Sequence, residues 1–170
     1  MFDALFTTTT EYKKLSHALS GKGACALFGL PASGRAQVYA ALCRQLDKPL
    51  CIVTPGEAEA TRFAADLNTL GIPAAVFPAR DYVLRPIEGT AREYEYRRLA
   101  VLGELVGGRL RAVAVPAEAL TQFTTPKEDF CANTRTLHAG DTLLRDDLLA
   151  ALFGAGYTRR CLLYTSPSPR

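Results

Sequence analysis

The feature that most constrains the fold of this chain is a repeated alternation of short apolar runs with longer amphipathic stretches. Four apolar runs have the length of buried strands, and they lie at 24–30, 49–54, 74–78 and 111–116. Stretches with helical periodicity separate them, and parallel strands need crossover connections of this kind. The pattern therefore predicts a doubly wound α/β fold with a mostly parallel sheet that helices cover on both faces.

The character of the sequence changes near residue 123, which predicts a second domain. Residues 1–122 form the predicted α/β domain, and 123–160 begin with a polar, alternating segment followed by an amphipathic helix. That helix must bury several leucines, but too little chain remains to supply a sheet. We therefore expect 123–160 to be an incomplete small α+β domain. The Ser/Pro-rich end, 161–170, lacks periodicity and is expected to be disordered or non-native.

Composition sets broad limits on function. The 170 residues are 48% hydrophobic and 22% charged, which is typical of a globular protein, and the net charge of +3 is too small to indicate nucleic acid by itself. Five cysteines without a CxxC pair and two isolated histidines predict no metal site. No secretory signal or long apolar run occurs, so we expect a cytoplasmic protein that has no membrane partner.

The segment GLPASGRA, which begins at Gly29, has nearly the spacing of a phosphate-binding loop. In the pattern GxxxxGK(S/T), backbone N–H groups surround the phosphates, the lysine reaches the terminal phosphates and the hydroxyl binds magnesium. Gly29 and Gly34 keep the spacing, with Ser33 between them. Arg35 stands in the place of the lysine and Ala36 in the place of the hydroxyl residue. Because arginine has a different donor geometry and alanine cannot bind a metal, this helicase-like P-loop is degenerate and we expect no hydrolysis.

Three interpretations of this segment remain open at the level of sequence. It can be an ordinary strand-to-helix turn built from small residues, a decayed ancestral nucleotide site, or a site that still works with arginine in place of lysine. No catalytic residue and no cofactor is predicted for this chain. Asp146 and Asp147 lie near the start of a predicted helix, where acidic side chains favour the helix dipole, and so do not indicate acid-base catalysis.

A basic and aromatic stretch offers a second candidate surface. Arg80, Arg85, Arg97 and Arg98 alternate with tyrosines between residues 80 and 98, a mixture that is typical of proteins that bind single strands. Acidic residues in the same stretch offset most of the charge, and Glu93 with Arg97 makes a favourable helical pair. The stretch therefore predicts either a solvated helix with its loop or a nucleic-acid or partner surface.

Several segments, taken in order, resemble the N-terminal module of the bacterial transcription-repair coupling factors, the Mfd family. They are GLPASGRAQ, CIVTPGEAEATRFAADL, VFPARDYVLRPIEGTAREYEYRRLAVLGELV, VAVPAEALTQ and HAGDTLLRDDLLAALFGAGYTR. The resemblance covers roughly residues 10–160, and the ordered series is more specific than any single motif. The excision-repair helicase UvrB is similar in its first part but keeps an intact GK(S/T) loop, so Arg35 and Ala36 favour the coupling factors.

The resemblance implies a part of a DNA translocase that removes stalled RNA polymerase and recruits excision repair. Its ATP- and magnesium-dependent motor, and its contacts with DNA and RNA polymerase, would lie downstream of this chain. The module itself would be non-catalytic, and its second domain would dock the UvrA damage sensor and help to regulate the motor. The docking contacts would lie beyond the equivalent of Arg160, so no residue here is assigned to them.

Two other classes of function stay open. An ATP-binding fragment of a UvrB-like excision-repair helicase would use Arg35 in place of lysine. A structural α/β domain of unrelated history would need only the small residues of the turn. A measurement of nucleotide binding would distinguish the ATP-binding fragment from an interaction module.

Overall fold

The computed structural model describes residues 7–21, 23–46, 48–80 and 93–157, and the chain divides into two compact units, 1–123 and 124–170. The first unit contains, in order, α2 (Thr10–Ser20), α3 (Ala32–Gln45), β1 (Leu50–Thr54), α4 (Glu57–Thr69), β2 (Ala74–Val76), α5 (Glu93–Val106), β3 (Ala112–Pro116) and α6 (Ala117–Leu120). The second unit contains α7 (Lys127–Asn133) and α8 (Arg145–Gly154).

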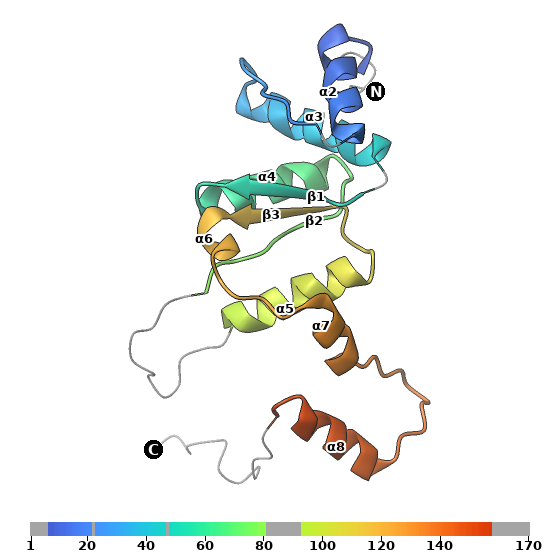
Figure 1. Cartoon of the computed structure of the whole chain (residues 1–170). Coiled ribbons are helices and arrows are strands. Elements are labelled where there is room, and N and C mark those ends of the chain that lie inside the picture. The colour runs from blue at the N-terminus through green and yellow to red at the C-terminus, as the bar shows by residue number, and fades with distance from the viewer. Residues whose placement is uncertain (1–6, 22, 47, 81–92, 158–170) are drawn as a thin grey trace. The chain divides into compact units, whose positions relative to one another are not determined.

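A three-stranded parallel sheet in the order β1-β3-β2 organises the first unit (Figure 1). Strand β3 lies in the centre, where Ala112 pairs with Leu50 of β1 and with Ala74 of β2. All five residues of β3 are buried. A short apolar run without alternation is typical of a strand that is covered on both faces, and the sequence AVAVP fulfils that pattern.

Alternate residues of β3 face two different helices. Ala112 and Ala114 belong to the apolar cluster that α4 covers, together with residues of α3. Val113 and Val115 belong to the opposite cluster, which contains Val101 of α5. Because side chains alternate along a strand, the Ala-Val repeat presents a small surface to α4 and a larger one to α5. Figure 1 shows the sheet between these two helices.

Helices α2 and α3 pack against each other through a separate apolar cluster. Tyr12 and Leu15 of α2 contact Val38 and Leu42 of α3 in this cluster. Thr9 caps the start of α2, because its hydroxyl accepts a hydrogen bond from the Tyr12 amide at 3.3 Å. The apolar face of α2 is therefore explained by its contact with α3, whereas α3 also packs against the sheet.

Arginine side chains satisfy the carbonyl groups at the ends of two helices. Arg111, just before β3, donates from Nη2 to the carbonyl oxygens of Cys43 at 2.6 Å and Leu46 at 2.9 Å at the end of α3. Arg44 donates to the carbonyl of Leu70 at the end of α4. The last carbonyls of a helix have no intrahelical donor, and a positive charge there also favours the helix dipole.

The α/β class and the parallel sheet are confirmed, but the predicted strand at 24–30 is wrong. Residues 24–30 have no regular secondary structure, and the Phe28 side chain is 89% exposed. This segment connects the paired helices α2 and α3, which carries it away from the edges of the sheet (Figure 1). An apolar run becomes a strand only where a neighbouring edge can pair with its backbone groups. The strand-loop-helix arrangement of a P-loop is therefore not found at 24–46.

The second unit contains two helices and no strand within its described residues, 124–157. Helix α7 lies in the polar segment for which the sequence predicted alternation. Helix α8 occupies the predicted amphipathic stretch, with Asp146 and Asp147 in its first turn. Its three leucines are half-buried, and the N-cap residue Leu144 is 71% exposed.

Replacement of Arg111 by alanine is expected to lower the free energy of unfolding by about 1–3 kcal/mol, because two carbonyl groups lose a charged donor. Urea unfolding followed by circular dichroism measures this change. The matched control is Arg62→Ala, because Arg62 is an exposed arginine on α4. Equal effects of the two substitutions would contradict the capping role of Arg111.

Candidate functional site

The turn from Gly29 to Gly34 has a different geometry from the one its sequence predicts. Gly29 has a φ of 82°, which favours glycine, and the chain then enters α3 directly. Pro31 is the N-cap residue, and its φ of −65° and ψ of 160° give the extended backbone that is usual at this position. Ser33 and Gly34 therefore lie in the first turn of α3 and not in a loop that wraps a ligand.

The start of α3 keeps one property of a phosphate site. Pro31 makes no side-chain hydrogen bond to the first turn, and that turn contains no acidic residue. Free backbone N–H groups and the positive end of the dipole are the elements that attract anions to a helix N-terminus. The charge and the metal ligand of a P-loop would have to come from positions 35 and 36.

Positions 35 and 36 both serve the fold in this structure. The Arg35 guanidinium lies 3.7 Å from Glu59 Oε1 on α4, in an ion pair that is partly exposed. Ala36 is 2% exposed and belongs to the core cluster between α3, α4 and the sheet. A hydroxyl at a position buried in this way would face the core and not a bound metal. The two P-loop positions that differ from the pattern therefore contribute to the packing of α3 on α4.

The predicted basic surface divides into exposed and buried residues. Arg80 and Arg97 are exposed, whereas Arg98 is 3% exposed and so provides no surface for a partner. Arg85 lies outside the described residues. The structure therefore leaves Arg80 and Arg97 as the described candidates for contact.

Arg98 instead organises a buried polar network after the end of β2. Its guanidinium lies over the Phe77 ring at 4.0 Å and donates from Nη1 to the Pro78 carbonyl at 2.7 Å and to Gln122 Oε1 at 3.2 Å. Burial, and secondly the charge of Arg80, lowers the pKa of Arg98. The hydrogen bonds and the aromatic face offset the cost of burying the charge.

Gln122 is the residue of this network that the sequence did not indicate. It accepts from the Arg80 amide at 2.7 Å and donates from Nε2 to the Arg80 carbonyl at 3.2 Å, so it fixes the backbone where the chain leaves β2. A single glutamine after a short helix gives no signal by spacing or composition. Its role becomes clear only in the structure, where α5 and α6 pack on the same face of the sheet.

The described residues hold no group of three or more His, Cys, Asp or Glu side chains that could bind a metal ion. Within the same part of the chain, no helix is long and apolar enough to cross a membrane.

A comparison with known proteins finds similarity to a transcription-repair-coupling factor of Bacillus subtilis (strain 168). The two sequences are 26% identical over 135 residues, which is 78% of this chain and 12% of the Bacillus protein. This chain thus spans only a small part of the length of that relative. No protein-family model matches the chain, and no solved structure shows a significant match. The similarity to this coupling factor extends over most of the present chain.

Replacement of Arg98 by alanine is expected to lower the free energy of unfolding by about 2–4 kcal/mol, because it leaves a cavity and removes one donor from each of two acceptors, the Pro78 carbonyl and Gln122 Oε1. The control is Arg97→Ala, which removes the same side chain from the exposed face of α5. Chemical denaturation of both variants measures the difference. A loss for Arg97→Ala as large as that for Arg98→Ala would contradict the network.

Proposed function

We propose that this chain is a non-catalytic N-terminal module of a transcription-coupled DNA repair translocase. The observation that carries the proposal is the similarity to the Bacillus subtilis coupling factor over 135 residues. It is supported by positions 35 and 36, where an ion pair to α4 and a buried methyl group replace the lysine and hydroxyl of a P-loop. In this proposal the module acts by recognition, and the motor that uses ATP and magnesium belongs to another part of the parent protein.

The proposed partner is a UvrA-type damage sensor, which docks on the second unit. In the second unit, the apolar side chains of Leu144 and Phe153 are 71% and 54% exposed. Leu144 is the N-cap of α8 and Phe153 lies near its C-terminal end, so the helix leaves apolar side chains open to a partner at both ends. The module also regulates the motor by occupying or releasing a surface of the parent protein. DNA and RNA polymerase are contacted by other domains of that protein.

The proposed absence of ATP hydrolysis is tested with a variant that restores the P-loop sequence. The double substitution Arg35→Lys with Ala36→Thr creates GLPASGKT, yet we expect no phosphate release above background from either protein. The reason is that side chain 36 lies in the core. Phosphate release and calorimetry with Mg-ATP measure activity and binding. Turnover by the unmodified chain that Gly34→Val abolishes would favour a UvrB-like ATP-binding fragment instead.

UvrA docking is tested by capture on immobilised protein. The first sample is residues 1–170, and the second joins residues 1–157 to the segment of the Bacillus subtilis factor that follows the matched region. We expect the completed protein to capture UvrA at least about ten times more strongly, because a docking surface that lacks part of its domain loses most of its contacts. Equal capture by both proteins, or capture by neither, would contradict the proposed docking.

A further inference from the structure

Helix α5 carries apolar side chains on two sides, and one of these sides packs on the sheet (Figure 1). Val101, Leu102 and Leu105 lie on the packed side, at the spacing of one helix face. They belong to the same apolar cluster as Val113 and Val115 of β3. A helix that covers one face of a sheet is normally polar on the side that faces water. The outer side of α5 departs from that pattern.

The outer side of α5 carries large apolar side chains around small ones. Tyr96, Leu99 and Val106 are 66%, 46% and 43% exposed. Ala100 and Gly103 lie between them in the sequence, and spacings of three, four and seven residues place all five on one side of the helix. We call these five residues the α5 patch. Small residues at its centre would let the backbone of a second helix approach closely, so the shape of the patch suits a helical partner.

The two ends of the α5 patch carry opposite charges. Glu93 and Glu95 are exposed in the first turn of α5. Arg109 follows the last turn, and its Nε and Nη2 donate to the Glu104 carboxylate at 2.7 and 2.8 Å. Its Nη1 lies against the end of the helix, because a Cβ on Gly107 would be only 2.9 Å from it. The N–H groups of Nη1 have no acceptor within the described part of the chain and can bind one from a partner.

An antiparallel copy of the same helix matches both the shape and the charge of the α5 patch. In a two-fold pair centred on the patch, Leu99 of one copy lies opposite Gly103 of the other, and Tyr96 lies opposite Val106. The acidic first turn of one copy then lies beside Arg109 of the other, and the two-fold axis repeats each of these contacts. We propose that the α5 patch binds the α5 patch of a second copy of this chain in an antiparallel pair. This surface is distinct from residues 29–36 and does not depend on the function proposed above.

The test measures self-association of the full chain by sedimentation equilibrium over a range of concentrations. One pair of helices buries less than a standard interface of about 1,600 Å², so we expect a dissociation constant in the micromolar range. Leu99→Lys is expected to weaken association at least about tenfold, because it places a charge where the apolar side chain meets the second copy. The matched control is Leu27→Lys, since Leu27 is 48% exposed but lies between α2 and α3. The control is expected to change association less than about twofold.

Charge reversal tests the antiparallel direction of the pair. Glu93→Lys is expected to weaken association by about 3–10-fold, because both symmetry-related contacts with Arg109 become repulsive. The double variant Glu93→Lys with Arg109→Glu is expected to restore it, because both partners of each contact are then reversed. Circular dichroism shows that each variant keeps its helices. A chain that stays monomeric, equal effects of Leu99→Lys and Leu27→Lys, or no restoration in the double variant would each overturn the proposal.

Discussion

The central strand β3 is the constraint on which the rest of the first unit depends. Its backbone pairs with β1 and β2 on both edges, and its side chains are buried on both faces. The small methyl groups of Ala112 and Ala114 let α4 fill the space with larger residues such as Phe63 and Leu67, which join the same cluster. Volume in a packed core must match on both sides, so the alternation of small and large residues on β3 determines which helix covers which face.

The position of α3 follows from this arrangement. Its small residues, Ala36 and Ala40, enter the cluster that covers the alanine face of β3, and Arg111 beside β3 binds the carbonyl groups at its end. The helix is therefore held by packing along one side and by charge at its C-terminus. Because Ala36 packs α3 against this cluster, it is not available to bind a nucleotide. The residue that departs from the P-loop pattern at this position is thus one that stabilises the helix.

The sequence predicted the class of fold because strands and helices have different periods. It placed three strands within a few residues of their observed positions, with helical stretches between them. The prediction of a strand at 24–30 was wrong, because an apolar run does not show which strand of a sheet it can pair with. It also placed Arg98 on a surface, since charge is normally exposed, whereas contacts with Phe77 and Gln122 bury this side chain. Such contacts join residues that are distant in sequence, so local patterns do not contain them.

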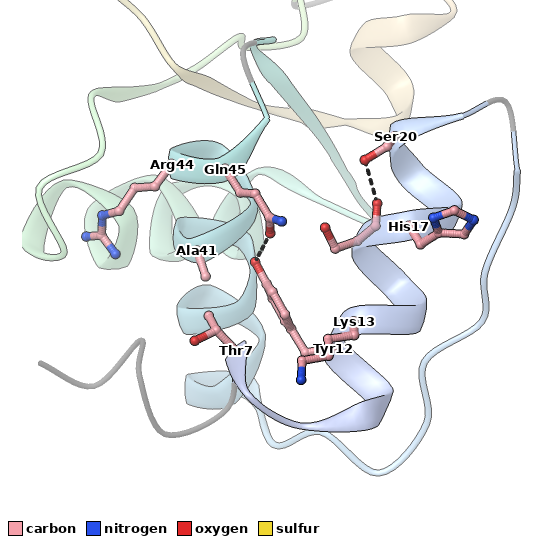
Figure 2. A pocket seen from close by; sticks show the side chains of 9 residues that line it. Thr7, Tyr12, Lys13, His17, Ser20, Ala41, Arg44 and Gln45 are labelled. Carbon is pink, nitrogen blue, oxygen red and sulfur yellow. Dashed lines mark hydrogen bonds between the residues drawn. The ribbon is translucent and has the colours of Figure 1, made fainter.

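The same limit explains why the groove between α2 and α3, which Lys13, His17 and Arg44 line, had no signal in the sequence. Lys13 and His17 are ordinary exposed residues of an amphipathic helix, and Arg44 belongs to a different helix. Their place along one groove depends on the apolar cluster that sets the two helices side by side, and the Arg44 side chain points away from α2 (Figure 2). Arg98 shows the opposite case, in which packing withdraws a charge from solvent. A count of basic residues thus says little about binding until the core determines which of them face water together.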